Sequence, residues 1–273
     1  MFRIYAGLTD AKAKAMVRKT LFVHGRAVCP VCKVRRRFKT LSDDRYFCGR
    51  CRKKYSLKQL AGFSGAKLSW PQILVLGRAF IKNYTLESAR DASAVSYPTV
   101  RRYYELLREK AAKFTKERTG FLSGRVAIDA CYIGKRKNNN QAVVLGVVQE
   151  NYENLAFRIV REEDQGYVEK FLYDTTTPWS HVIHDGHTAY KDLSWTGVTH
   201  EAEIHELGQF KKTVPIERIW ALLRTRLRRT YHHVWKEKLP GYLAEFRFKF
   251  LYRSTGKNQQ EFLQFLTLPA PNA

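Results

Sequence analysis

The chain has 273 residues, of which 44% are apolar and 13% aromatic, and this composition excludes a disordered tail. Its 49 Lys and Arg against 25 Asp and Glu leave a formal net charge of +24, which favours a polyanionic partner, nucleic acid before a membrane surface. No apolar run reaches the roughly 18 residues of a membrane-spanning helix, and residues 1–19 lack the apolar stretch of a signal peptide, so we expect a cytoplasmic, nucleoid-associated protein.

The first predicted elements are a short helix and a cysteine-bearing module, both within residues 1–60. Apolar residues recur at helical spacing from Thr9, with lysines on the other face. Four of the five cysteines then form two Cys-x-x-Cys pairs, fifteen residues apart, a spacing typical of a structural zinc site closed by four thiolates. The alternative is four free or disulfide-bonded cysteines, and the fifth, Cys131, is expected to be a small buried residue on a strand. The predicted zinc ligands are Cys29, Cys32, Cys48 and Cys51.

Basic residues crowd around the two cysteine pairs and alternate with aromatic side chains. Only Asp43 and Asp44 oppose them, so a phosphate-contacting surface is favoured over a merely solvated charged face. The DNA contacts predicted from this module are Arg35, Arg36, Arg37, Lys53 and Lys54.

Residues 61–120 are predicted to form three helices. Ser69 is a capping residue at the start of the first, Thr85 caps the second, and a short turn precedes the third. Arg101 and Arg102 lie near the start of that third helix and are further predicted DNA contacts. The pattern is typical of a helix-turn-helix whose last helix enters a major groove, although three helices that only support the next domain give the same signals.

Beyond residue 120 the helical periodicity gives way to β-branched, largely apolar stretches. Three strands in succession, a helix and a further strand form the order of a ribonuclease-H-like sheet, which we expect helices to cover. The predicted class is therefore α+β, a zinc ribbon and helix-turn-helix followed by a ribonuclease-H-like mixed sheet flanked by helices. The predicted domains are residues 1–60, 61–120 and 121–273, and the predicted strands are 125–133, 141–148, 155–160 and 179–185, with a helix at 166–172.

Two aspartates stand out in this last domain. Asp129 lies inside an apolar strand, and Asp185 ends another strand just before a glycine. A carboxylate buried in a sheet is costly unless it is paired or binds a metal. Two such carboxylates, with a third from a nearby helix, can hold two magnesium ions roughly 4 Å apart, an arrangement that serves phosphodiester chemistry. Taken alone, either aspartate is more often a cap, a turn residue or a salt-bridge partner.

The third carboxylate is sought on a later helix that a proline opens. Glu217 lies in the first turn of that helix, and Glu201 or Glu203 could replace it as a ligand. Arginines follow along the same helix and indicate a DNA-facing element, with Arg224 and Arg228 as predicted contacts.

Five motifs in this order resemble bacterial insertion-sequence transposases related to the eukaryotic Merlin elements. That family also begins with a zinc ribbon and a helix-turn-helix, so the resemblance covers nearly the whole chain. It implies a DDE-type transposase that binds the terminal inverted repeats of its element, cleaves the ends with two Mg²⁺ or Mn²⁺ ions and joins the 3′-hydroxyls to target DNA, as a homodimer or larger assembly on DNA. The motifs are Ile128–Gly134, His184–Tyr190, Ile216–Leu223, Arg229–Val234 and Tyr242–Phe248.

The resemblance also assigns individual residues. Asp129 and Asp185 match the first two acidic ligands of the family. Glu217 matches the glutamate of its Asn-x-x-Glu-x-x-Trp motif, and His205 matches a histidine upstream of that helix. Arg224 stands at the position of a family lysine.

Three positions depart from the family: Ala130, Val214 and Leu251 stand where it has an acidic residue and two asparagines. Two interpretations therefore stay open, an active transposase and a catalytically impaired or domesticated copy that only binds DNA. An RNA-binding zinc-ribbon protein would account for the charge but not for Asp129 and Asp185 in apolar strands.

Overall fold

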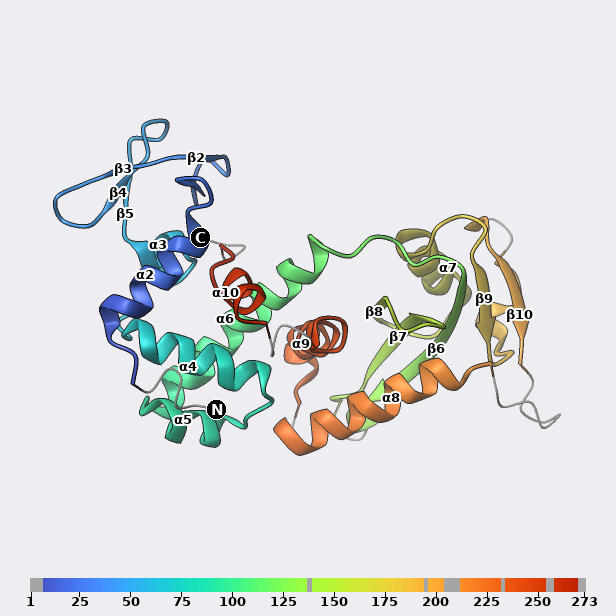
Figure 1. Cartoon of the computed structure of the whole chain (residues 1–273). Helices are drawn as coiled ribbons and strands as arrows, with labels where there is room; N and C mark the ends of the chain where they lie inside the picture. Colours follow the sequence, from blue (N-terminus) through green and yellow to red (C-terminus); the bar gives the residue numbers. More distant parts are fainter. Residues whose placement is uncertain are drawn as a thin grey trace. The chain divides into compact units, whose positions relative to one another are not determined.

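The computed structural model describes residues 7–136, 139–193, 196–203, 212–231, 234–253 and 258–269. Contacts divide the chain into two compact units, Met1–Glu117 with Tyr252–Ala273, and Arg118–Leu251. Figure 1 labels the elements of both units, and each unit is described by itself below.

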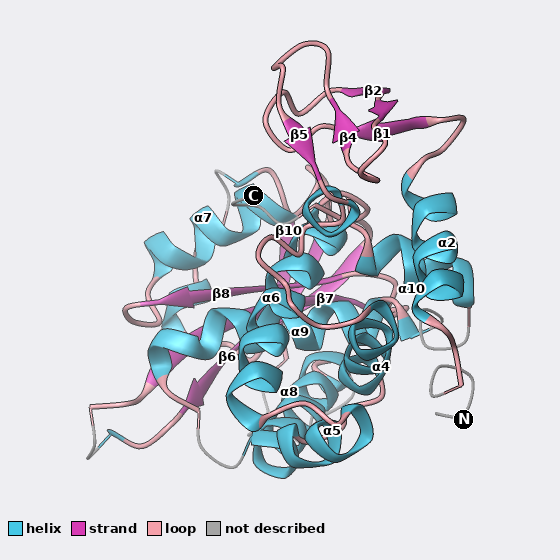
Figure 2. Cartoon of the chain, turned by 90° about the vertical axis from the view of Figure 1, so that its left-hand side faces the viewer, coloured by secondary structure: helices cyan, strands magenta, loops and turns pink. Residues whose placement is uncertain are grey.

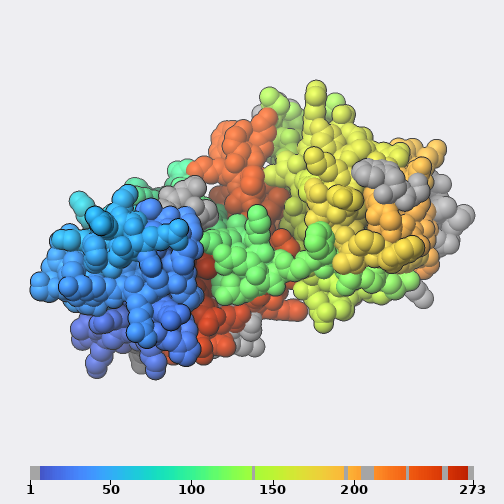
Figure 3. All heavy atoms as spheres, turned by 90° about the horizontal axis from the view of Figure 1, so that it is seen from above, coloured from blue at the N-terminus to red at the C-terminus, as the bar shows by residue number. Residues whose placement is uncertain are grey.

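The first unit begins with a helix and a module of short strands. Helix α2 lies where the sequence predicts a helix, and Thr9 caps it by accepting a hydrogen bond from the backbone N–H of Lys12 at 3.4 Å. The strands form a two-stranded and a three-stranded antiparallel sheet, which lie together at one end of this unit (Figure 2). In the space-filling view, residues 7–60 form one contiguous part of the surface (Figure 3). The elements are α2 (Asp10–Leu21), β1 (Arg26–Val28), β2 (Arg35–Arg37), β3 (Lys39–Thr40), β4 (Tyr46–Phe47), β5 (Lys54–Tyr55) and α3 (Leu57–Leu60).

Four longer helices complete this unit. Ser69 and Thr85 cap two of them, as predicted, because their hydroxyls accept from backbone N–H groups three residues later. A Cβ on Gly77 would lie 2.8 Å from the Leu266 side chain, so this glycine allows the last helix to approach closely. The segment after Tyr252 therefore packs in this unit, whereas the sequence pattern continues it from the preceding domain. The helices are α4 (Trp70–Ile81), α5 (Leu86–Ser93), α6 (Tyr97–Lys116) and α10 (Gln259–Leu266).

The second unit is built on a five-stranded mixed sheet with the order β10-β9-β6-β7-β8. Strands β6, β7 and β8 pair antiparallel, and β9 and β10 continue the sheet in parallel from the other side of β6. The short, polar edge strand β10 is the one strand that the sequence pattern does not reveal. The strands are β6 (Arg125–Ile133), β7 (Ala142–Gln149), β8 (Leu155–Val160), β9 (His181–His184) and β10 (Thr199–Ala202).

Helices cover both faces of this sheet (Figure 1). On β6, Val126 and Ile128 pack with α7 on one face, whereas Ala127 and Cys131 pack with α8 and α9 on the other. Cys131 is fully buried, as expected from the sequence. The covering elements are α7 (Gln165–Thr175), α8 (Val214–Arg226) and α9 (Leu239–Leu251), with short turns of 3-10 helix at Thr188–Tyr190 and Lys236–Lys238 and of π-helix at Leu227–Tyr231.

The α+β class and the mixed sheet flanked by helices are thus confirmed. Among the described helices, none combines the length and the apolarity that crossing a membrane requires.

Candidate functional site

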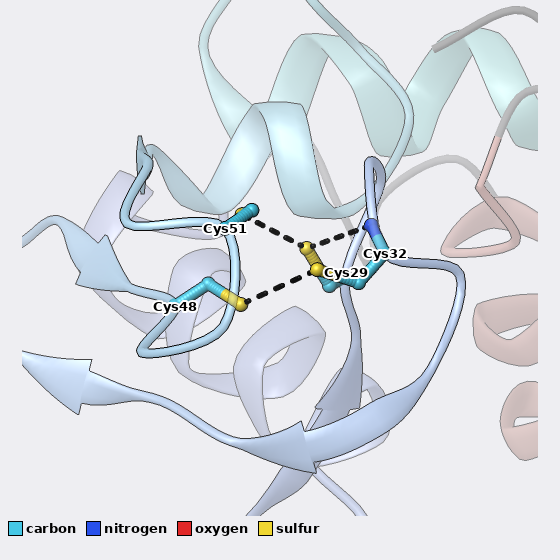
Figure 4. Close-up of side chains that lie close together, drawn as sticks. All are labelled: Cys29, Cys32, Cys48 and Cys51. Atoms are coloured by element: carbon cyan, nitrogen blue, oxygen red, sulfur yellow. Dashed lines mark hydrogen bonds between the residues drawn. The ribbon is translucent and has the colours of Figure 1, made fainter.

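The four cysteines of the N-terminal module converge on one point (Figure 4). Each pair occupies a turn of the same shape, in which the backbone N–H of the residue after the second cysteine donates to the carbonyl of the first, Lys33 to Cys29 and Arg52 to Cys48. Lys33 and Arg52 both take a left-handed backbone with φ near 56°. The two turns therefore aim two pairs of thiols at each other.

The spacing of the sulfurs fits a tetrahedral zinc ion. The Sγ atoms of Cys29 and Cys51 lie 3.7 Å apart, those of Cys32 and Cys48 lie 4.0 Å apart, and all four lie within 4.8 Å of one another. Four sulfurs at the usual zinc–sulfur distance of about 2.3 Å stand about 3.8 Å apart, and all four protein ligands together leave no position for a reacting water. The predicted cysteine cluster is therefore present, and its donor set suits a structural ion.

The basic residues predicted beside this cluster lie on its strands and turns. Arg35, Arg37, Lys53 and Lys54 are exposed. Arg36 is half-buried, and its Nη1 lies 4.0 Å from the Cys48 sulfur. Its positive charge there favours the thiolate form of Cys48. In the helices of this unit Arg101 and Arg102 are exposed as well, and in the second unit so are Arg224 and Arg228.

Asp129 lies in the middle of the central strand β6 and faces α8. It accepts a hydrogen bond from the indole Nε1–H of Trp220, on α8, at 2.9 Å. Burial raises the pKa of Asp129 to about 6, and the carboxylates of Asp185 and Glu163 add to this rise, against the opposing hydrogen bonds from the Ala130 backbone and Trp220. The charge on Asp129 is therefore unfavourable in the folded chain without a cation.

A glycine on the neighbouring strand makes room for this contact. Gly146 on β7 is the register partner of Asp129. A Cβ there would lie 2.4 Å and 2.6 Å from two ring atoms of Trp220, a clash that the buried indole could not relieve without moving. Gly146, Trp220 and Asp129 thus pack against one another, and this packing fixes the position of the Asp129 carboxylate.

Asp185 follows β9 directly, and its carboxylate is exposed. Its Oδ1 accepts from the backbone N–H of His187 at 3.0 Å. The preceding His184 is buried, accepts from the Gly186 N–H at 3.1 Å through Nδ1, and lies 3.1 Å from His200 through Nε2. Because burial and the neighbouring His200 lower the pKa of His184 to about 4, this ring is neutral and holds the Asp185–Gly186 turn in place.

Glu163 lies between β8 and α7, and the sequence pattern does not single it out. Its side chain is only 10% exposed and accepts hydrogen bonds from the hydroxyls of Tyr190 at 3.1 Å and Tyr132 at 3.3 Å. Burial raises the pKa of the Tyr190 hydroxyl, and the negative charges of Glu163, Asp129 and Asp185 raise it further.

Among the residues that the structure describes, no lysine or arginine nitrogen forms an ion pair with Asp129, Asp185 or Glu163. Besides its two tyrosine partners, Glu163 has the imidazole of His187 nearby, with the Nδ1 3.7 Å from a carboxylate oxygen. Hard ions such as Mg²⁺ prefer oxygen ligands, which these carboxylates can offer.

Glu217 lies in the first turn of α8, one turn before Trp220, as predicted. It is exposed and accepts from the Thr213 hydroxyl at 3.0 Å. The two alternatives are held elsewhere. Glu203 is buried and accepts from the backbone N–H groups of Lys212 and Thr213, just before α8, and Glu201 is paired with Lys212 at 2.6 Å.

Within the described ranges, the four cysteines form the one group of three or more potential ligands whose atoms all lie within 4.8 Å of one another. Neither the carboxylates of Asp129, Asp185 and Glu217 nor those of Asp129, Asp185 and Glu163 are drawn together that closely. His205, which the resemblance assigns to the same region, lies outside the described residues.

Residues 121–250 match the family model described as the ISXO2-like transposase domain. No curated protein matches the chain. Among solved structures, a chain from the cryo-EM structure of the simian T-cell lymphotropic virus intasome in complex with PP2A regulatory subunit B56 gamma aligns with 48% of this chain and 50% of its own length, at 14% identity and a TM-score of 0.34. This chain thus spans about half the length of that one, and at this TM-score the similarity is too weak to indicate a shared fold.

Proposed function

We propose that the chain is a DDE-type DNA transposase, a proposal supported by the match of residues 121–250 to the family model of the ISXO2-like transposase domain. It binds the terminal inverted repeats of its element, cleaves the ends and joins the 3′-hydroxyls to target DNA. The observation that carries this proposal is the placement of Asp129 on β6 and of Asp185 directly after the adjacent strand β9, close enough for the charge of Asp185 to raise the pKa of Asp129.

The sheet supports a ribonuclease-H-like catalytic domain. Three antiparallel strands, a helix and two further parallel strands beside the first strand are the order expected for that fold. Asp129 lies on the first strand and Asp185 directly after the fourth, on adjacent strands β6 and β9. This adjacency is what a pair of metal-binding aspartates requires.

Two divalent ions bound there would activate the attacking oxygen and steady the leaving oxygen of a phosphodiester. The protein's own residues supply the ligands and hold them. Trp220 and Gly146 fix Asp129, and the neutral His184 fixes the turn that bears Asp185. Glu217 is the proposed third ligand, in keeping with the resemblance, and Glu163 adds negative charge beside the aspartates.

The first unit supports DNA binding by two modules. The paired cysteine turns are those of a zinc ribbon, and α5 ends at Ser93 while α6 begins at Tyr97, leaving the short turn of a helix-turn-helix. Arg101 and Arg102 then lie at the start of the helix that would enter the major groove. The proposed DNA-binding domains are residues 1–60 and 61–120, in the same compact unit as the segment after Leu251, and the proposed catalytic domain begins at residue 121 and ends at Leu251. The substrate is double-stranded DNA in the bacterial nucleoid. Joining two element ends needs at least two copies of the chain.

A cleavage assay tests the catalytic proposal. A supercoiled plasmid that carries the two ends flanking the gene is incubated with the zinc-loaded chain and Mg²⁺ or Mn²⁺. We expect nicking and strand transfer by the wild type, and loss of both in Asp129→Ala and Asp185→Ala with DNA binding retained. The matched control is Asp174→Ala, which removes an exposed carboxylate on α7 that is ion-paired with Arg158 on β8. Full activity in both catalytic variants would refute the assignment, and binding without cleavage by the wild type would favour the impaired copy.

A metal analysis tests the zinc proposal. We expect one zinc per chain, lost in Cys29→Ser or Cys48→Ser together with the fold of the N-terminal module, since the metal replaces a core too small to form alone. A module that stays folded without metal would contradict the proposal.

A further inference from the structure

Two adjoining cavities of the first unit share one residue, Ser64. The smaller, about 380 Å³, runs beside the first cysteine turn and the strand that follows the second, and Lys53 and Lys54 contribute to its wall. The larger, about 640 Å³, lies between loop 62–68 and α6. Because Ser64 lines both and is exposed, the two cavities meet at this residue, and together they are called the trough below.

Helix α6 contributes a single face to the trough. The lining residues lie between Thr99 and Glu109 at helical spacing, a stretch of about 15 Å at 1.5 Å per residue. Arg102 stands toward the start of this face, next to the turn that precedes the helix, and Glu105 and Glu109 stand toward its end.

The opposite wall is held rigidly. Gly62 and Gly65 take positive φ values of 75° and 69°, a backbone that bends the loop sharply. The Phe63 ring stacks on Tyr103 with centroids 6.0 Å apart. Lys58 donates from its Nζ to the carbonyls of Ala66 at 3.3 Å and Leu68 at 2.6 Å. A wall fixed in this way is available to a ligand without a cost for ordering the loop.

Charge along the trough is uneven. Lys53 and Lys54 line the part beside the cysteine cluster, and Lys67 and Arg102 line the larger cavity, all four of them exposed. Glu105 and Glu109 line the far part of the α6 face. An anionic polymer can therefore follow the trough from the cysteine cluster past Ser64 to the start of α6, and it is repelled beyond that point.

We propose that this trough binds one sugar–phosphate strand of the DNA duplex, so that the cysteine module and α6 contact a single continuous DNA segment. The inference deepens the proposed function and rests on its DNA-binding part. The occupant is a DNA strand because the cations line one path between two elements, whereas a small anion needs a single cluster of charge. Phosphate contacts of this kind fix the register of a protein on DNA and carry no sequence information.

A charge placed at the junction tests the proposal. Ser64→Glu introduces a negative charge where the two cavities meet, and Ser64→Gln introduces a neutral side chain of the same size; both sit at an exposed position and leave the packed residues untouched. The probe is a random-sequence 40-base-pair duplex, titrated with the zinc-loaded full chain at several salt concentrations. We expect Ser64→Glu to bind about tenfold more weakly than Ser64→Gln, since the added charge repels a phosphate at close range.

Neutralising the lining provides the second measurement. Arg102→Gln is expected to reduce the salt dependence of the binding constant by about one phosphate contact, whereas Lys82→Gln, at an exposed lysine that does not line the trough, leaves it unchanged. Equal affinities of Ser64→Glu and Ser64→Gln, with a wild type that binds the duplex in a salt-dependent way, would overturn the trough and leave the transposase proposal standing. Equal weakening by both would show that size and not charge matters, and would overturn it too. A wild type that fails to bind the duplex would overturn both proposals.

Discussion

Replacing Asp129 by asparagine is expected to stabilise the metal-free protein at neutral pH while destroying its activity. The pKa of Asp129 is raised to about 6 in the folded chain, chiefly by burial, against about 3.9 for an unfolded aspartate. The ionised carboxylate is thus disfavoured on folding, and at pH 7 it costs about 3 kcal/mol of the free energy of unfolding. Asparagine removes this cost and keeps an oxygen to accept from Trp220.

The sign of the effect sets its pH dependence. The pKa of Asp129 is higher in the folded chain than in the unfolded one, so protonation of Asp129 stabilises the fold as the pH drops from 7 through 6. Below about pH 4.5 the ionised carboxylate costs less than about 1 kcal/mol of the free energy of unfolding. Urea unfolding in EDTA, followed by tryptophan fluorescence, should therefore show Asp129→Asn more stable than the wild type at pH 7 and nearly equal to it at pH 4.5. The reasoning is refuted if the variant is no more stable at pH 7, or if the difference is the same at both pH values.

Three further predictions concern the packing and charge of both units. Gly146→Ala should cost about 1–3 kcal/mol in unfolding free energy and lower activity, because the new methyl group displaces the Trp220 indole; unchanged unfolding and activity would refute the packing argument. Glu163→Gln should raise the Mn²⁺ concentration needed for half-maximal cleavage, and comparison with Glu217→Gln ranks the two carboxylates; an unchanged Mn²⁺ requirement would remove Glu163 from the site. Lys110→Met leaves three carbonyl oxygens, two of them in buried hydrogen bonds, without their Nζ donor, at about 1–3 kcal/mol for each buried one before relaxation. The variant should expose the C-terminal segment to limited proteolysis, whereas wild-type resistance would contradict this role.

Local signals in the sequence account for most of the secondary structure. The hydroxyls of Ser69 and Thr85 cap the helices that the sequence predicts, since a side-chain oxygen before an apolar periodic stretch has few other roles. The apolar runs that end at Ile133 and Val160 become strands at the expected places. The cysteine cluster was also predictable, because Cys-x-x-Cys spacing alone folds a turn that presents both sulfurs.

Features that depend on distant packing were not predictable. Glu163 lies in a loop between a strand and a helix, and nothing in its neighbours along the chain indicates that Tyr132 and Tyr190 enclose it. Similarly, the packing of α10 in the first unit depends on Gly77 and on the carbonyls that accept from Lys110. The contact between Lys110 and Leu266 joins residues more than 150 positions apart. Such pairs leave no periodic signal in one sequence.

Binding of divalent ions by the zinc-loaded chain tests the central claim most directly. Mn²⁺ is titrated into the wild type, Asp185→Asn and the control Asp174→Asn, and the free ion is measured by electron paramagnetic resonance. If the carboxylates on adjacent strands together hold the catalytic ions, the wild type and the control bind Mn²⁺, and Asp185→Asn does not. Equal Mn²⁺ uptake by all three proteins would contradict the account.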